Sequence, residues 1–126
     1  MPSRIFATAL LAASALTCLA ILPAKAAPST SRGEISVAQV MEMLDKAPHE
    51  ATARQVLVAY LAGVGETTGV LIRAARTTCQ GPLALTDRAA HQALKAAARQ
   101  GNSAETAATP LLVDDMIKRA GCSLSR

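Results

Sequence analysis

The stretch EATARQVLVAYLAGVGETTGVLIRAAR, residues 50–76, is the longest periodic segment of the chain and decides its fold. Apolar and small residues recur in it every three or four positions, which is the period of an α-helix. One face of such a helix carries Ala53, Val56, Leu57, Tyr60, Gly63, Val64, Thr67, Leu71 and Ala74, and the opposite face carries Gln55, Ala62, Glu66, Gly69 and Arg73. Leu61 and Ile72 fall between the two faces, so the apolar surface is unusually wide. We expect one long helix, or two nearly collinear ones, at the centre of a helical bundle.

Three glycines, Gly63, Gly65 and Gly69, interrupt this segment, and each costs about 1 kcal/mol relative to alanine inside a helix. The simplest reason for such a cost is the close approach of a neighbouring backbone. A phosphate-binding loop fits poorly, because the run lies inside a helix instead of after a strand and lacks the Lys-Ser/Thr ending. The Gly65-x-x-x-Gly69 spacing also occurs in membrane helix dimers, but Glu66 and Arg73 make this segment a poor membrane span.

Three shorter helices are predicted around the long one. They are a helix over Val37–Lys46 capped by Ser36, a helix over 87–99 capped by Thr86, and a last helix that begins between Ala104 and Pro110 and stops at Gly121. Their inward stripes are Val37, Val40, Met41 and Leu44; Ala90, Ala93, Leu94 and Ala97; and Leu112, Val113, Met116, Ile117 and Ala120. The last helix starts either with Thr109 as cap and Pro110 as its first residue, or one turn earlier. No strand-like alternation is present, so we expect an all-α fold, a small compact bundle of about four helices.

Residues 1–26 have the organisation of an export signal. Arg4 supplies a positive start, an apolar run follows over 5–22, and Ala24-Lys25-Ala26 is a small-residue site for a signal peptidase. We therefore predict cleavage before Ala27, a flexible polar leader over residues 27–35 and one helical domain over residues 36–126. An uncleaved membrane anchor is the main alternative, because the apolar run is near the minimum length that spans a bilayer. A lipid-modified Cys18 fits less well, because Thr17 is a poor residue before a lipidation cysteine.

Removal of residues 1–26 leaves 100 of the 126 residues, with two cysteines, Cys79 and Cys122. Tyr60 is then the single aromatic residue, so the core must consist of Ala, Leu, Val, Ile and Met, which bury less area than aromatic side chains. A small domain of this kind needs additional stabilisation. Export brings the chain into oxidising conditions, and a disulfide between the two cysteines contributes about 4 kcal/mol in the chain-entropy model. We therefore predict that bond and an exported protein.

Composition and motifs argue against several functional classes. Two of the 13 basic residues leave with residues 1–26, so 11 remain against 9 acidic residues, too small an excess for nucleic-acid binding. His91 lies four residues after Asp87, a spacing that suits metal ligation, but two ligands do not make a site and no third is indicated. No nucleophile motif such as G-x-S-x-G is present. We predict a non-enzymatic protein without a metal or another cofactor.

Two surface features are candidates for contact with a protein partner. Glu66 and Arg73 stand on the same face of the long helix, where they form either a solvated stripe or a partner-binding one. The polar loop over residues 100–106, with Asn102, Ser103 and Glu105, is either an ordinary helix connection or a protruding contact loop. The predicted disulfide would stiffen the hairpin that carries this loop and so lower the entropy cost of binding.

The order of several short motifs resembles the Rap/Tai-type periplasmic immunity proteins of type VI secretion. The motifs are a cleaved signal, Tyr60-x-x-Gly63 in a helix, Cys79 after that helix, Leu85-Thr86 opening an Ala-rich helix, and AATPLLVDDMIKRAGC over residues 107–122. The similarity covers most of residues 37–122. It implies an all-helical, often dimeric periplasmic protein that binds and blocks a cell-wall amidase injected by another bacterium.

Within this resemblance, Cys79 and Cys122 correspond to the structural disulfide, and Tyr60 and Gly63 to the core motif of the central helix. Family members commonly carry a further cysteine just before the tyrosine, where this chain has Val56 and Leu57, so the sequence has no second bridge. The leading hypothesis is an exported binding protein that plugs the cleft of a peptidoglycan amidase effector with a loop on a rigid helical frame. A homodimer is compatible with it, and no stable membrane insertion is expected after signal cleavage.

The main alternative from a different class is a small periplasmic chaperone of the acid-stress type, which is also helical, exported and singly disulfide-bonded. That alternative predicts exposed apolar surface and client binding at low pH. A third alternative is an enzyme, which predicts a pH-dependent hydrolytic activity in the purified protein.

Overall fold

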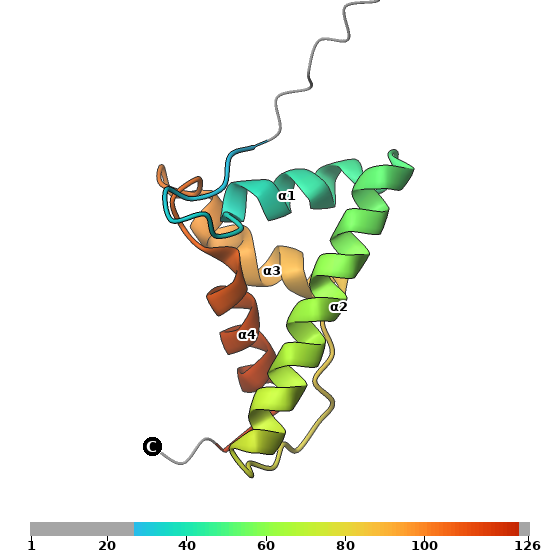
Figure 1. Ribbon diagram of the computed structural model, residues 1–126, viewed down its shortest axis with the longest axis vertical. Coiled ribbons are helices and arrows are strands. Elements are labelled where there is room, and N and C mark those ends of the chain that lie inside the picture. The colour runs from blue at the N-terminus through green and yellow to red at the C-terminus, as the bar shows by residue number, and fades with distance from the viewer. Residues whose placement is uncertain (1–26, 124–126) are drawn as a thin grey trace, which may run out of the picture.

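The computed structural model describes residues 27–123, and the export signal predicted for residues 1–26 lies outside them. The described part of the chain is all-α, with helices α1 (Val37–Lys46), α2 (Ala51–Ala74), α3 (Asp87–Ala98) and α4 (Ala108–Arg119). In Figure 1, α1 lies across the top of the view, α2 descends on the right, α4 descends on the left, and α3 lies between them. The prediction of a compact bundle of about four helices is confirmed.

The core lies where the four helices meet. α1 packs against α2 and α3, and α4 packs against α3 and α2. The buried core residues are Val37, Val40, Ala47, Leu57, Leu61, Val64, Ala90, Leu94, Ala108, Leu112 and Met116. All of them are aliphatic or methionine, as the composition predicts. Burial of each Leu, Val or Met side chain contributes about 1.5–3 kcal/mol, which makes these few contacts the main stabilising interaction of a small domain.

Two of the helices begin at the capping residues that the sequence predicts. Ser36 Oγ accepts a hydrogen bond from the Gln39 amide at 3.1 Å, and Gln39 Oε1 accepts one from the Ser36 amide at 3.0 Å, which together form a capping box. Thr86 Oγ1 accepts a hydrogen bond from the Ala89 amide at 3.2 Å at the start of α3. Each cap satisfies an amide that has no partner within the first turn of its helix.

α4 starts within the predicted range between Ala104 and Pro110, two residues before Pro110. The helix begins at Ala108, so Pro110 occupies its third position, where a missing N–H leaves no hydrogen bond unmade. Thr109 therefore lies inside the first turn and does not cap it. Its hydroxyl is free to bond elsewhere, and it lies 2.8 Å from the hydroxyl oxygen of Tyr60.

The face of α2 that enters the core differs from the predicted one. The buried stripe is Leu57, Leu61, Val64, Thr68 and Ile72. Val56 and Leu71, expected on the inner face, are 51% and 56% exposed, so the inner stripe is rotated by about a quarter of a turn from the prediction. Apolar or small residues line α2 on nearly every side, and its contacts with α1 and α4 therefore select the buried stripe. Thr68 is tolerated in the core because its hydroxyl donates to the Val64 carbonyl at 2.7 Å.

Residues 27–35, expected to be a flexible leader, form defined contacts in the structure (Figure 1). Thr30 is 5% exposed, and its amide donates to the Glu34 carbonyl at 3.0 Å. The Gly33 amide donates to the Thr30 carbonyl at 2.8 Å, and Gly33 has a φ of +78°, a conformation that glycine adopts without a side-chain clash. The leader is a folded part of the domain because its backbone polar groups find partners within the chain.

A disulfide joins Cys79 to Cys122 across 43 residues, as predicted. It connects the chain just after α2 to the end of α4, where the amides of Gln80 and Gly81 also donate to the Ala120 carbonyl at 2.9 and 3.0 Å. The lower end of the bundle in Figure 1 is thus held by a covalent bond and by backbone hydrogen bonds. Such a bond forms and persists under oxidising conditions, which indicates an oxidising compartment.

Candidate functional site

A groove runs between α2 and the 75–86 connection that leads to α3. Its volume is about 630 Å³, and its lining residues are Leu61, Ala62, Gly65, Glu66, Gly69, Val70, Arg73, Leu83 and Leu85. We call it the α2 groove. Glu66 and Arg73 both line it, so the structure brings the two charges predicted on one helical face to a single concave site. Apolar lining beside opposite charges can accept an apolar side chain of a partner and pair with the polar groups around it.

Glycines keep the α2 groove open. A Cβ atom at Gly65 would lie 3.9 Å from Met116 Cε, and one at Gly69 would lie 3.4 Å from Arg73 Nη1. At Gly63, apart from its chain neighbours and the adjacent backbone of α2, no atom of the described residues lies within 4 Å of such a Cβ. The expected approach of a neighbouring backbone is therefore wrong, since the nearest atoms belong to side chains. The absent side chains of Gly65 and Gly69 instead leave space on the surface of α2.

Tyr60 links the middle of α2 to the start of α4. Its hydroxyl is hydrogen-bonded to Thr109 Oγ1 at 2.8 Å, and burial raises the pKa of the phenol, an effect that this hydrogen bond partly opposes. Gly63 lines a shallow cavity of about 320 Å³ together with Tyr60, Thr109 and Val113. Tyr60 and Gly63 therefore lie at the border between core and surface, where Tyr60 joins two helices and Gly63 leaves space.

The 100–106 loop packs against the amino-terminal part of the chain. The Glu105 carboxylate accepts a hydrogen bond from the Ser31 amide at 3.0 Å, and this hydrogen bond lowers the pKa of Glu105. The Ser103 carbonyl accepts one from the Ala38 amide at 3.2 Å, and the Asn102 carbonyl accepts one from the Glu105 amide at 2.9 Å. Ser103 and Glu105 thus contact the leader and α1, while Asn102 is exposed. The loop and the leader support each other, which the sequence does not predict.

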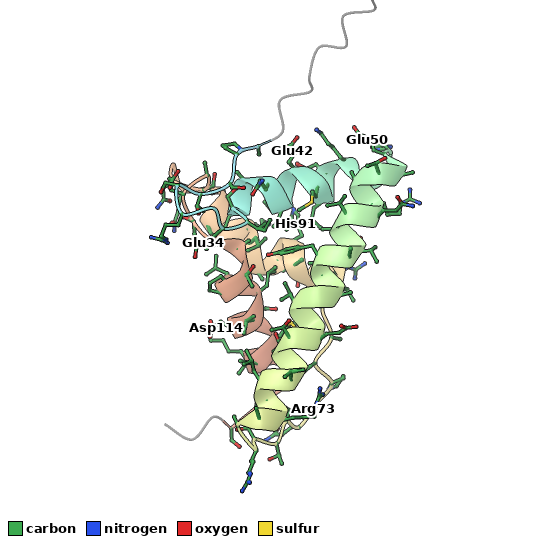
Figure 2. All side chains as sticks on the ribbon, viewed as in Figure 1. Glu34, Glu42, Glu50, Arg73, His91 and Asp114 are labelled. Carbon is green, nitrogen blue, oxygen red and sulfur yellow. A yellow bond between two sulfur atoms is a disulfide. The ribbon has the colours of Figure 1, made fainter. Side chains whose placement is uncertain are left out.

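The two predicted contact features lie at different ends of the molecule. The 100–106 loop, orange in Figure 1, is at the upper left beside the blue leader. Arg73 is near the lower end of α2 in Figure 2. A partner that fills the α2 groove therefore meets a surface separate from the one that carries Asn102.

A polar cleft lies where α1 ends and where α2 and α3 begin. Its volume is about 440 Å³, and its lining residues are Leu44, Asp45, Ala47, Pro48, Arg54, Asp87, Arg88 and His91. Asp87 and His91 therefore share a cleft, but Arg54 and Arg88 add positive charge that opposes the binding of a cation there. Within residues 27–123, no group of three or more His, Cys, Asp or Glu side chains is arranged to hold a metal ion.

Large apolar side chains remain exposed along α2. Val56, Val58, Val70 and Leu71 are each more than half exposed. Among the described helices, α2 is the one long and apolar enough to cross a membrane, by length and composition alone, and 28% of its most apolar window is buried. The core helix of a soluble protein can pass the same test of length and composition.

The two leucines that form the outer wall of the α2 groove were missed in the sequence. Leu83 and Leu85 alternate with Pro82 and Ala84, and this alternation is typical of an extended segment with one side turned inward. Both leucines are half-buried, whereas Pro82 and Ala84 are exposed. The pattern could have identified the wall, but four residues are too few to distinguish from an ordinary connection.

No family model, curated protein or solved structure matches this chain. Its function is therefore inferred from the geometry described above and from the order of its motifs.

Proposed function

We propose that the chain is an exported, non-enzymatic protein-binding module that acts in the periplasm as an immunity protein of the Rap/Tai type. Its partner would be a peptidoglycan amidase effector of type VI secretion. The order of motifs over residues 37–122 supports the family, and the α2 groove is the observation that carries the binding role. The groove offers apolar contact from Val70, Leu83 and Leu85 and opposite charges from Glu66 and Arg73.

The wall of this groove is held in place by the part of the fold that contains the disulfide. Arg119 on α4 donates through Nη2 to the Ala84 carbonyl at 2.9 Å, between the two wall leucines. The Cys79–Cys122 bond fixes the start of the same connection. A site formed before the partner arrives loses less conformational entropy on binding, so a small groove can support a stable complex.

This mechanism differs in one respect from the loop-plugging mechanism expected from the sequence. The side chain of Glu105 and the backbone of Ser103 are engaged with the leader and α1, which leaves Asn102 as the exposed candidate of that loop that takes no part in these two contacts. We therefore propose the α2 groove as the primary contact and the 100–106 loop as a secondary one.

Co-purification with candidate amidases, followed by inhibition of peptidoglycan cleavage, tests this function. We expect Glu66→Lys and Arg73→Glu to weaken effector binding at least about tenfold without loss of helicity, because each places a like charge opposite the partner's complementary group. Lys95→Glu on the exposed side of α3 is the matched control and should change affinity less than about twofold. Equal binding by all three variants would remove the α2 groove from the interface.

The α2 groove could also be the surface through which two copies of the chain form a homodimer, and this is tested separately. Sedimentation over a range of concentrations measures the oligomeric state. Val70→Glu should yield a monomer if the copies pair through the α2 groove, because the new carboxylate would be buried without a partner. An unchanged sedimentation coefficient for Val70→Glu excludes this route to a homodimer.

The acid-stress chaperone is a second candidate because the contacts of the leader depend on ionised carboxylates. Glu42 and Glu105 both accept hydrogen bonds from leader amides, and these bonds weaken on protonation. Ala27 and Ile35 of the leader line a cavity of about 370 Å³, and release of the leader would remove this part of its wall and leave other lining residues, such as Met43 and Val56, more exposed. This candidate predicts that the protein binds a hydrophobic dye and suppresses the aggregation of client proteins at about pH 2–3. A protein that stays folded and dye-free in acid excludes it.

A further inference from the structure

Glu42 on α1 lies at the point where the leader begins. Its Oε2 accepts a hydrogen bond from the Ala27 amide at 2.5 Å, and its Oε1 accepts one from Lys46 Nζ at 2.5 Å. Figure 2 shows Glu42 on the upper side of α1, next to the entering chain. Ala27 is the residue that directly follows the Ala24-Lys25-Ala26 site.

Ala27 is held at this position by the residues that follow it. The Pro28 carbonyl accepts a hydrogen bond from Ser36 Oγ at 2.8 Å, and Ser36 is fully buried. Thr30 is buried two residues further on. A chain anchored at both positions places the Ala27 nitrogen beside α1 independently of Glu42.

We propose that the Glu42 carboxylate binds the α-ammonium group that signal cleavage creates on Ala27. The proposal rests on the export step of the proposed function and is independent of the identity of the partner. Before cleavage, the Ala27 nitrogen is an uncharged amide with one N–H. Hydrolysis of the Ala26–Ala27 peptide bond consumes one water molecule and leaves a carboxylate on Ala26 and, after the amine takes up a proton, an ammonium on Ala27. Before cleavage only the acceptor of the hydrogen bond to Glu42 is charged; after cleavage the bond joins two opposite charges and gains their Coulombic attraction.

The surrounding charges permit this pair. Lys46 already binds the other oxygen of Glu42, and Glu50 at the start of α2 also acts on the charge of Lys46. Two cations therefore face two carboxylates. The hydrogen bonds from Lys46 and from Ala27 lower the pKa of Glu42, so its carboxylate is ionised at neutral pH. Arg32 forms an ion pair with Glu34 at 3.0 Å within the leader, and Glu105 is bonded to Ser31.

The α-amine of the exported protein provides the direct test. The full gene is expressed with export, the protein is recovered from the cell envelope, and intact mass identifies the first residue. Competitive labelling with acetic anhydride over a pH series then gives the pKa of the α-amine. We expect a value about one unit above the ordinary 7.7–8.0 of a free α-amine, and about fourfold slower labelling at pH 8 than in Glu42→Gln.

Asp45→Asn is the matched control, because it removes the same charge from the same helix without contact to Ala27; it should label at the wild-type rate. Lys46→Met is the second variant, and it leaves Glu42 in place. Removal of the competing cation should slow labelling beyond the wild-type rate. Equal labelling of wild type and Glu42→Gln, or no response to Lys46→Met, overturns the proposal. A chain that retains residues 1–26 or starts at another residue overturns its export premise, whereas a chain that starts at Ala27 with an ordinary amine overturns the Glu42 contact alone.

Discussion

The two ends of the bundle are held together by different kinds of interaction. At the upper end in Figure 1, the leader, α1 and the 100–106 loop are joined by hydrogen bonds, several of which end on carboxylates. At the lower end, the Cys79–Cys122 disulfide joins the exit of α2 to the exit of α4, and Leu71 remains more than half exposed. The upper end should therefore respond to pH and to signal cleavage, and the lower end to reduction of the disulfide.

Loss of the disulfide should lower the stability of the protein more than any other change that we propose, and it should act first at the lower end. Replacement of both cysteines, as in Cys79→Ser with Cys122→Ser, opens a loop of 43 residues and should lower the free energy of unfolding by about 4 kcal/mol in the chain-entropy model. Chemical denaturation followed by circular dichroism measures the change. Because the disulfide is at the lower end, hydrogen exchange should increase there first in the double variant.

The matched control is the oxidised wild type in the same buffer. A double variant within about 1 kcal/mol of wild type, or one that loses protection first in α1, would contradict the assignment of the lower end to covalent stabilisation.

Two leucines of α2 test which side of the helix is buried, and their replacement leaves the polar contacts at both ends of the bundle in place. Leu57 is fully buried and Leu71 is 56% exposed, although the sequence placed both on one inner face. Leu57→Ala should cost about 3 kcal/mol through lost burial and the cavity it leaves. Leu71→Ala should cost less than about 0.5 kcal/mol, because an exposed side chain leaves no cavity. Urea denaturation of the two variants compares them directly, and equal costs would show that the inner stripe is the predicted one.

These leucines also show how far the sequence determines the fold. Helix boundaries were predicted well where a capping residue marks them, as Ser36 and Thr86 do, because a cap is a local interaction between neighbours in the chain. The buried stripe of α2 was predicted wrongly because α2 has apolar residues on most of its sides, so the helical period alone does not identify which side is buried. Only the positions of α1 and α4, which the local sequence does not contain, decide which stripe is covered.

The candidate site was predicted to a similar degree. Glu66 and Arg73 are seven positions apart, so the helical period alone places them on one face. Their groove, however, needs Leu83 and Leu85 from a connection whose path depends on the disulfide and on Arg119. The contact between Glu105 and Ser31 spans 74 positions, and nothing in either local segment indicates it.

Tyr60 lies between the two ends, and its hydroxyl should contribute a smaller amount. Tyr60→Phe removes the hydrogen bond to Thr109 while it retains the ring, so we expect a loss of about 1 kcal/mol. Thermal unfolding measures it, and Thr109→Val is the reciprocal variant. If the two hydroxyls stabilise each other, the double variant should lose less than the sum of the single losses. Strict additivity would mean that each hydroxyl acts through water instead.

Acid should release the upper end with the smallest effect on global stability. The pKa values of Glu42 and Glu105 are lowered below the ordinary 4.5, mainly by the hydrogen bond from Lys46 to Glu42 and by the one from the Ser31 amide to Glu105. A lowered pKa in the folded state means that each carboxylate stabilises the fold fully above its ordinary pKa and loses this effect as the pH falls through the lowered value. As the pH falls from about 6 to about 3, the Ser31 amide should therefore lose protection from hydrogen exchange relative to the core of α2.

Glu105→Gln should lose this protection already at neutral pH, whereas Asp114→Asn on the exposed side of α4 should leave it unchanged. If the Ser31 amide stays protected in acid and in Glu105→Gln, the upper end is stabilised by the backbone hydrogen bonds of its turns and not by its carboxylates.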